Sequence, residues 1–375
     1  MNIKPFQYLH PDYKKISKTL DFFDQVKNTF PDLRKEEIYV ESDQKAIFVY
    51  RIKSATRTYQ GILAAVDIHD YLKGHIKKHE NTLTLQEENI SNLMKNRSAI
   101  IKPVLIAYNE QKKIKDLLTK SFDDQKATFK IFFEKDQQIH EFYEITDKKW
   151  IALIQKEFKS KIKKAYIADG HHRMAAVCKF ILQNPELSKR SLNYIMCALF
   201  DFNELSIMPY NRLIKALDLM SLNDFILMLR KYALVTKLKK SRLSNKKNEL
   251  ILITKDLQYV ISWHKEVLQY FKQKNGIAFD IDIFNELILR DMLGIQNIRS
   301  NDRIQHIEGI KNMKIISKLV LENSQHLGFL FYPVKKSDFI KVADEHMVLP
   351  PKSTWFEPRI KNGIIVQELN LELIP

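Results

Sequence analysis

Glycine is scarce in this chain, which has only 8 glycines among 375 residues, against an average use of roughly 7%. In such a sequence a glycine is expected where a side chain cannot be accommodated. The two cysteines, Cys178 and Cys197, lie in apolar surroundings, which predicts reduced, buried thiols. No apolar run reaches about 18 residues, and the N-terminus lacks the apolar core of a signal peptide. These absences predict a cytoplasmic protein with no membrane partner.

Several sequence motifs of nucleotide-binding and hydrolytic proteins are also missing. The chain has no P-loop, no G-x-G-x-x-G, no G-x-S-x-G and no zinc-ligand cysteine pair, so the ordinary nucleotide folds are unsupported. Its net charge of +16 would suit a nucleic acid or a phosphorylated partner. However, the basic residues are spread out, without interleaved aromatics, and a lysine-rich composition explains them better. With no evident helix-turn-helix, we do not expect DNA as a partner.

Hydrophobic periodicity predicts a mixture of strands and helices. Apolar, β-branched runs predict strands at 46–50 and 59–66, and helical spacing predicts a helix over 13–30 that ends near Pro31. A turn is predicted at Pro209–Arg212. Strands that alternate with helices and hairpins indicate a mixed α/β or α+β fold.

One junction concentrates polar side chains where an apolar strand turns at Asp169-Gly170 into a helix. The N–H groups of a first helical turn can bind phosphate oxygens, and Arg173 can add a fork-shaped contact. His171 and His172 can donate hydrogen bonds or move protons near neutral pH. Asp169 can hold Mg²⁺ or accept a proton from a hydroxyl. The alternative is that Asp169 caps the helix and that the histidines are surface residues.

A second polar stretch follows Gly74. His75 and His79 are four residues apart, so on a helix they would share one face as a metal pair. The glutamate, Glu80, follows the second histidine, unlike the zinc-protease pattern. We therefore favour a substrate-contacting loop that includes Lys78, His79 and Glu80, with a solvated run of charges as the alternative.

The segment 350–359 near the C-terminus is stiffened by prolines. Trp355 and Phe356 are surrounded there by polar residues: Lys352, Ser353, Thr354, Glu357 and Arg359. Such a segment suits a ligand lid, and the alternative is packing of the two aromatic rings under a C-terminal strand. Arg299 and Arg303 form either a second anionic clamp or surface pairs with acidic residues.

Four separated segments together resemble one family, the bacterial and archaeal family catalogued as domain of unknown function 1015 and related to ParB. The matching segments are Lys73–Glu80, Tyr166–Arg173, Met208–Arg212 and Met347–Pro358. The resemblance implies an α+β (mixed α/β) fold with a ParB/sulfiredoxin-like core that carries the Asp-Gly-His-His-Arg motif. The implied division is a core over 1–210, a small α+β region over 211–280 and a C-terminal α/β segment over 281–375 that returns to the core.

The enzymatic cousins of this fold are free-serine kinases, so the resemblance implies a nucleotide-dependent phosphotransferase acting on serine or a similar small hydroxyl compound. The implied cofactors are Mg²⁺, held by Asp169, and a nucleotide, either ATP or ADP. The expected catalytic residues are Asp169, His172 and Glu80. The expected phosphate- or nucleotide-binding residues are Gly170, His171, Arg173, Lys78, His79, Arg299 and Arg303. The expected substrate-binding or lid residues are Asn211, Arg212, Lys352, Ser353, Thr354, Trp355 and Glu357.

This sequence departs from the family in lacking its N-terminal proline-tyrosine-aspartate segment. If that segment supplies a catalytic carboxylate, the chain binds a nucleotide or phosphate without turning it over, and we keep this non-catalytic alternative. The sequence leaves the oligomeric state open, with a homodimer as one option.

Overall fold

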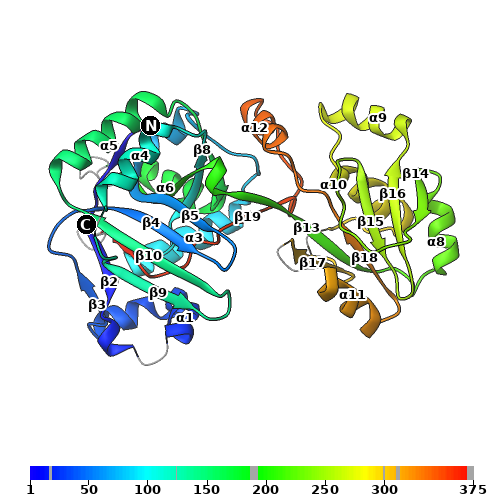
Figure 1. The fold of residues 1–375 in the computed structure, drawn as a ribbon, viewed down its shortest axis with the longest axis horizontal. Helices are drawn as coiled ribbons and strands as arrows, with labels where there is room; N and C mark the ends of the chain where they lie inside the picture. Colours follow the sequence, from blue (N-terminus) through cyan, green and yellow to red (C-terminus); the bar gives the residue numbers. More distant parts are fainter. Residues whose placement is uncertain (17–18, 124, 186–192, 299, 310–312, 370–375) are drawn as a thin grey trace. The chain divides into compact units, whose positions relative to one another are not determined.

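The computed structural model describes residues 1–375 except 17–18, 124, 186–192, 299, 310–312 and 370–375. The chain forms two compact units. The first comprises Met1–Ser206, Ala343–Val348 and Pro358–Pro375, and the second comprises Ile207–Val342 and Leu349–Glu357. Each unit combines a β-sheet with helices (Figure 1), which confirms the predicted mixed α/β fold. None of the helices in the described ranges is long and apolar enough to cross a membrane.

The first unit is built on a nine-stranded sheet with the order β6-β11-β8-β12-β5-β4-β10-β9, in which β1 also pairs with β5. Its strands are β1 (Ile3–Lys4), β4 (Ile47–Lys53), β5 (Thr58–Asp67), β6 (Ile76–Lys77), β8 (Val104–Tyr108), β9 (Phe129–Phe133), β10 (Gln138–Ile145), β11 (Ala165–Asp169) and β12 (Tyr194–Asp201). The predicted strands at 46–50 and 59–66 are thus confirmed as β4 and β5. Both faces of the central strands are buried, which explains their nearly continuous apolar sequences.

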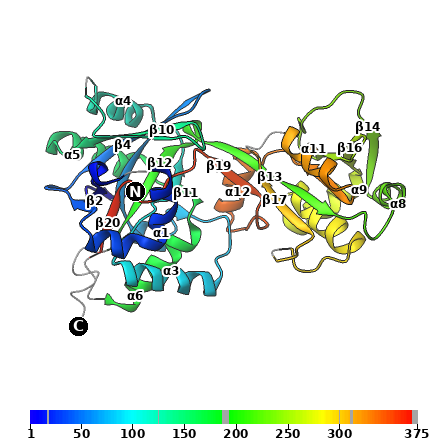
Figure 2. The ribbon, with the colours of Figure 1, turned by 90° about the horizontal axis from the view of Figure 1, so that it is seen from below.

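Helices cover the two faces of this sheet, with α4 and α5 on one face and α3 and α6 on the other (Figure 2). The helical segments of the first unit are η1 (Tyr13–Lys15), α1 (Thr19–Lys35), α2 (Ile68–Leu72), α3 (Thr84–Arg97), α4 (Lys112–Ser121), α5 (Lys148–Lys161), α6 (His171–Gln183) and η2 (Phe202–Glu204). Helix α6 starts where the sequence predicted it, directly after Gly170.

A smaller sheet with the order β3-β2-β20-β7 completes the first unit. Its strands are β2 (Tyr8–Pro11), β3 (Tyr39–Glu41), β7 (Ala99–Ile100) and β20 (Val366–Glu368). The predicted end of the first helix at Pro31 is wrong, because α1 continues through this proline to Lys35. Val26 and Phe30 are buried in a hydrophobic cluster with this sheet, so tertiary burial outweighs the hydrogen bond that the proline removes.

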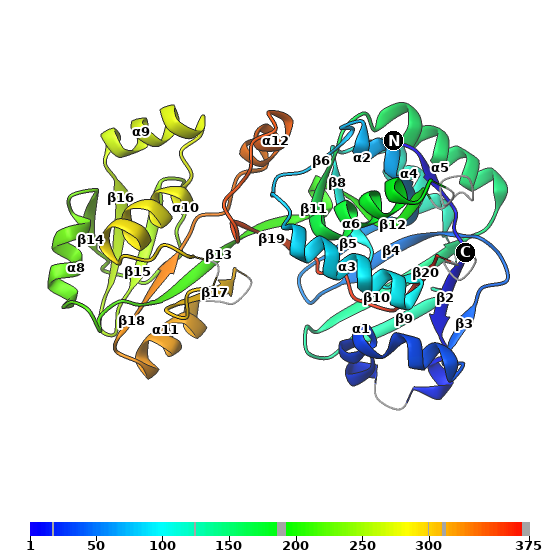
Figure 3. The ribbon, with the colours of Figure 1, turned by 180° about the vertical axis from the view of Figure 1, so that it is seen from behind.

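The second unit contains a seven-stranded sheet with the order β14-β16-β15-β18-β13-β17, in which β19 also pairs with β13. Its strands are β13 (Ser206–Lys215), β14 (Ala233–Lys237), β15 (Glu249–Ile253), β16 (Gln258–Trp263), β17 (Ile304–Glu308), β18 (His326–Leu330) and β19 (Thr354–Glu357). Its helices are α8 (Leu222–Leu229), α9 (Lys265–Asn275), α10 (Asp280–Ile283), the π-helix η3 (Phe284–Met292), α11 (Met313–Glu322) and α12 (Lys336–Asp344), most of which are visible in Figure 3.

Aromatic and aliphatic side chains attach these helices to the two faces of the second sheet. On β18, the ring of Phe329 contacts Phe225 of α8 and Phe284 of η3. The neighbouring Gly328 lies against Ile316 and Val320 of α11. Since successive residues of a strand face opposite sides, α11 covers one face of the sheet, and α8 and η3 cover the other.

The predicted turn at Pro209–Arg212 is wrong, because β13 runs through it as one strand. Proline precedes the residues of β13 that pair with β17, from Tyr210, and with β18, from Arg212. The missing N–H of Pro209 therefore removes no hydrogen bond from either ladder.

Candidate functional site

The junction between β11 and α6 requires a glycine. Gly170 has φ +101°, a left-handed conformation that side chains disfavour. A Cβ atom at this position would lie 2.5 Å from Nη2 of Arg173. The side chain of Arg173 therefore folds back over Gly170, and its Nη2 donates a 2.8 Å hydrogen bond to Oδ2 of Asp169.

Sheet register brings other segments to this junction. Strand β6 pairs in parallel with β11, with Tyr166 opposite Lys77, so the residues that follow both strands lie at the same edge of the sheet. Strand β8 is antiparallel to β11, with Leu105 opposite Asp169, which places Lys102, just before β8, at that edge. The sheet thus brings together two segments that we predicted from the sequence to belong to a functional site, 78–80 and 169–173.

Three cations surround the carboxylate of Asp169. Oδ2 lies 2.8 Å from Nη2 of Arg173 and 3.4 Å from Nζ of Lys102, and Oδ1 lies 3.5 Å from Nη1 of Arg359. Three positive charges thus face one negative charge. We call Asp169, Arg173, Lys102 and Arg359 the cationic cluster. An electropositive centre of this kind, beside the N-terminus of a 13-residue helix, is suited to an anion.

Burial shapes the protonation states within the cationic cluster. Burial alone would raise the pKa of Asp169, but Arg173, Lys102 and Arg359 lower it overall, so this residue is a carboxylate. Burial lowers the pKa of Lys102 to about 8, an effect that Asp169 opposes and the two arginines reinforce. An anion bound here would favour the charged form of Lys102.

A pair of buried histidines lies beside this cluster. Nε2 of His171 is 3.2 Å from Nδ1 of His79, and the two rings meet edge to face. His79 also hydrogen-bonds to the backbone of Ile167. Burial lowers the pKa of His171 to about 3, and burial together with the His171 neighbour holds the pKa of His79 well below its usual value. Both rings are therefore neutral near pH 7.

Glu80 lies at the outer side of the histidine pair. Its Oε2 is 3.8 Å from Nδ1 of His171, and its side chain is 33% exposed. Lys78 is exposed on the same segment, and its charge contributes to the lowered pKa of His171. A carboxylate with this exposure can be reached by a small substrate and is a candidate proton acceptor.

A second helix begins next to the same residues. Nε2 of His172 accepts a 3.2 Å hydrogen bond from the backbone N–H of Leu83, which is the N-cap residue of α3. Helices α3 and α6 thus both direct the positive ends of their dipoles toward this region. His172 thus links the two helix starts. Its predicted catalytic role stays a prediction.

Asp169 does not fit the predicted magnesium ion. Mg²⁺ is held by oxygen ligands that face the metal, whereas both carboxylate oxygens of Asp169 face nitrogen cations. Within the described part of the chain, no group of three or more His, Cys, Asp or Glu residues could hold a metal ion. His75 and His79 do not share a helix face either: β6 lies between them, and Nδ1 of His75 is 3.0 Å from Asp70.

The remaining predicted site residues belong to the second unit. Asn211 accepts a 3.1 Å hydrogen bond from the N–H of Phe331. The fully buried Arg212 donates to the carbonyl oxygens of Tyr210 and Lys352, at 2.9 Å in both cases. The other predicted lid residues lie in or next to β19: Ser353, which donates to the Pro350 carbonyl, Thr354, and Trp355, which donates to Glu357.

Of the two arginines of the predicted clamp, the structure describes Arg303 alone. Arg303 is paired with Asp218 at 3.0 Å, and its Nη2 donates to the Lys215 carbonyl at 2.7 Å. It is therefore engaged within the second unit. Arg299 lies outside the described residues.

Sequence reasoning missed Lys102 and placed Arg359 only among the polar residues of the proposed lid segment. Lys102 carried one usable signal, since Lys-Pro directly precedes a buried strand and therefore lies at a sheet edge. Arg359 is 190 residues from Asp169, and no local pattern connects the two.

The fold and the site define a mixed α/β protein with a cluster of cations at one edge of a sheet. The chain belongs to the family described as "Protein of unknown function (DUF1015)", whose model matches residues 3–286. No curated protein matches the chain in sequence.

Three solved structures illustrate what the chain is similar to. A free serine kinase variant in complex with AMP is 13% identical, with 78% of this chain and 87% of that chain covered and a TM-score of 0.38. SbnI with a C-terminal truncation, from Staphylococcus aureus, is 10% identical, with 84% of this chain and 90% of that chain covered and a TM-score of 0.42. A conserved hypothetical protein from Pyrococcus furiosus is 15% identical, with 81% and 95% covered and a TM-score of 0.38.

Proposed function

We propose that the cationic cluster binds the phosphate groups of a nucleotide, and that the protein transfers a phosphoryl group to a small hydroxyl compound such as serine. The observation that carries the proposal is the gathering of three cations around the carboxylate of Asp169 at one helix start. Phosphoryl transfer depends mainly on positioning and charge neutralisation, and this arrangement supports both.

In the proposed reaction, the N–H groups of the first turn of α6 and the side chains of Arg173 and Lys102 bind the phosphates. The hydroxyl oxygen of the substrate forms a bond to the transferred phosphorus atom, the bond from phosphorus to the leaving nucleotide oxygen breaks, and Glu80 accepts the hydroxyl proton. Asp169 holds the cations in place. Mg²⁺ has no assigned ligand in this proposal, because Asp169 does not fit it.

The test combines binding and turnover. Purified protein is incubated with serine, Mg²⁺ and either ATP or ADP, phosphoserine is followed by phosphorus NMR, and nucleotide binding is measured by calorimetry. Glu80→Gln is expected to bind nucleotide but to form no product, and Arg173→Ala is expected to lose both. Arg34→Ala is the control, because Arg34 is a partly exposed arginine of the same unit that pairs with Glu368. The absence of nucleotide binding by the unaltered protein would overturn the proposal.

A non-catalytic nucleotide- or phosphate-binding function is the second candidate. The full engagement of Asp169 by nitrogen cations favours it, since the expected metal ligand is not available. It predicts nucleotide binding that Arg173→Ala abolishes, no phosphoserine, and no effect of Glu80→Gln. Turnover by the unaltered protein that Glu80→Gln abolishes would exclude it.

A further inference from the structure

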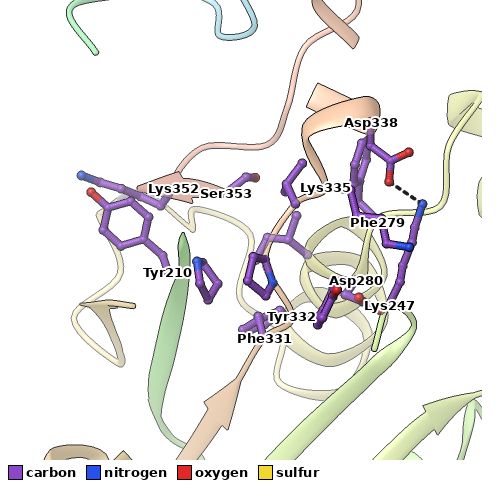
Figure 4. Close-up of a pocket in the computed structure, with 14 residues that line it drawn as sticks. Tyr210, Lys247, Phe279, Asp280, Phe331, Tyr332, Lys335, Asp338, Lys352 and Ser353 are labelled. Carbon is purple, nitrogen blue, oxygen red and sulfur yellow. Dashed lines mark hydrogen bonds and ion pairs between the residues drawn. The ribbon is translucent and has the colours of Figure 1, made fainter. Parts of the chain in front are cut away.

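A pocket lies entirely within the second unit and is separate from the residues of the cationic cluster. Its cavity volume is about 30 Å³, and the space around it is open to solvent, so a small molecule would be only partly enclosed there. Two of the segments that resemble the family contribute to its wall, with Pro209 and Tyr210 from one and Lys352 and Ser353 from the other; Tyr210 and Lys352 lie side by side (Figure 4). The function proposed above assigns no role to this pocket.

Aromatic rings form much of the pocket wall, contributed by Tyr210, Phe279, Phe331 and Tyr332. Phe331 is buried, and Asn211 fixes its backbone through the 3.1 Å hydrogen bond to its N–H. Rings held in this way offer flat apolar surfaces to a planar ligand.

The charges of the pocket leave a positive excess. Lys247 and Asp338 neutralise each other at 2.8 Å. Asp280 accepts hydrogen bonds from Nε1 of Trp263 at 2.9 Å and from the N–H of Asn248 at 3.1 Å, so its oxygens are engaged by the protein. Lys335 and Lys352, both exposed, also line the pocket.

A buried arginine fixes the backbone of one of these lysines. Lys352 has φ +58°, a left-handed conformation that is unfavourable for a side chain of its size. Its carbonyl accepts the 2.9 Å hydrogen bond from Arg212, which is fully buried. Burying a guanidinium group is costly, and strained backbone tends to occur at functional sites. The ammonium group of Lys352 lies 5.1 Å from the centre of the Tyr210 ring.

We propose that this pocket is a second binding site, for a small aromatic anion, in which Tyr210, Phe331 and Tyr332 contact the ring and Lys352 and Lys335 bind the carboxylate or phosphate group. A metal ion is disfavoured because both aspartates of the wall are already bonded to donors of the protein. The proposal does not depend on phosphoryl transfer in the first unit.

Tryptophan fluorescence can report on this pocket. Trp263 donates to Asp280 in the wall, and the Trp355 ring contacts the Tyr210 ring at 5.5 Å. The third tryptophan, Trp150, belongs to the first unit. A Trp150→Phe background therefore restricts the signal to the second unit, and an added Arg173→Ala substitution removes the binding proposed for the cationic cluster.

In this background the protein is titrated with benzoate, phenyl phosphate, benzamide, acetate and inorganic phosphate. We expect saturable changes with benzoate or phenyl phosphate, whose relative affinities identify the anionic group, and much weaker binding of benzamide, acetate and inorganic phosphate. Lys352→Asn, which tolerates the left-handed backbone, is expected to weaken binding about tenfold, and Lys352→Arg is expected to retain it.

The control substitution is Lys318→Asn, which removes an exposed lysine of α11 and should leave the affinity unchanged. Equal binding of acetate and benzoate would overturn the proposal, because the rings would then contribute nothing. Equal affinities of Lys352→Asn and the parent protein, or no saturable change with either aromatic anion, would also overturn it.

Discussion

The two units bury charge in opposite ways. In the first unit, the carboxylate of Asp169 is surrounded by three cations within 3.5 Å. In the second unit, the guanidinium group of Arg212 is fully buried, and its hydrogen bonds within the described chain all go to backbone carbonyl oxygens. Burial lowers the pKa of Arg212 to about 9, whereas the cations lower that of Asp169.

This difference shows that buried charges serve two purposes in one chain. A cluster of three cations around one carboxylate favours a bound anion. An isolated guanidinium group that binds carbonyl oxygens fixes the backbone and needs no ligand. We therefore expect anions to stabilise the first unit through Asp169 and its neighbours, and substitutions at Arg212 to act through the backbone of Lys352.

The largest effect is expected from Asp169→Asn. Three partly exposed cations would then lose their common counter-charge, and we expect the free energy of unfolding to fall by about 3 kcal/mol, the low end of the range for a buried pair. Asp344→Asn is the matched control, because the side chains of both aspartates are 27% exposed and both pair with cations. The control should lose only about 1 kcal/mol.

Urea unfolding, with and without sulfate, measures both variants. Sulfate should restore stability to Asp169→Asn more than to Asp344→Asn, since only Asp169 lies at a helix start with three cations around it. Equal losses in the two variants, or equal responses to sulfate, would contradict the picture of a cationic cluster that favours an anion.

The next effect is expected from Arg212→Met, which keeps the length of the side chain but removes its donors. The carbonyl oxygens of Tyr210 and Lys352 would lose a charged donor, at a cost that the relief of desolvating the guanidinium group partly offsets. We expect a net loss of about 2–3 kcal/mol in urea unfolding. Arg290→Met, at a 44% exposed arginine of the same unit, should change stability by less than about 1 kcal/mol, and an equal loss there would contradict the role of Arg212.

A smaller, pH-dependent effect is expected from Asp280. Burial raises its pKa to about 6, above the value of about 3.9 in an unfolded chain. Its contribution to stability is therefore fully present below about pH 4 and is lost as pH rises through about 6. The stability of the unaltered protein relative to Asp280→Asn should fall by about 2 kcal/mol between pH 4 and pH 7, and a constant difference would show that Asp280 does not titrate in this range.

The sequence predicted the segments of the first site correctly but not all of its contacts. The strand that ends at Asp169 and the helix that begins at His171 follow from local patterns, and the short parallel pairing of β6 with β11 brings His79 and Glu80 beside them. Lys102 and Arg359 were not assigned, because only the sheet register and the return of the C-terminal segment place them next to Asp169.

The two local errors, at Pro31 and Pro209, have one cause. In both cases proline was taken as a boundary, although its missing N–H costs little where burial is extensive or where the ladder begins one residue later. Arg212 shows that a sequence motif can also suggest a binding role for a residue that bonds to the protein itself. Its sequence neighbours resemble a ligand-contacting motif, but the side chain bonds to backbone carbonyls, a role that only the three-dimensional structure reveals.

A comparison of two glycines tests the geometry of the cationic cluster rather than its charge. Both Gly170 and Gly74 have positive φ, but an added Cβ would lie 2.5 Å from Arg173 at Gly170 and would meet nothing within 4 Å at Gly74. Gly74→Ala should therefore cost only the backbone term of about 1 kcal/mol. Gly170→Ala should cost a similar backbone term of about 1 kcal/mol, because the end of the Arg173 side chain can move aside, but it should also weaken sulfate binding, measured by calorimetry. Equal effects on sulfate affinity would mean that Arg173 does not contribute to the site.

The smallest effect concerns the charge of Lys102, whose pKa is lowered to about 8 mainly by burial. Below this pH the ammonium group adds to the attraction for an anion, and above it the group becomes neutral. Sulfate, whose own charge is constant in this range, should therefore bind up to about tenfold more weakly at pH 9 than at pH 7. Lys102→Arg should abolish this pH dependence, because arginine stays charged. If the affinity of the unaltered protein is flat between pH 7 and pH 9, the anion is bound by Arg173 and the helix start alone, and Lys102 serves only to neutralise Asp169.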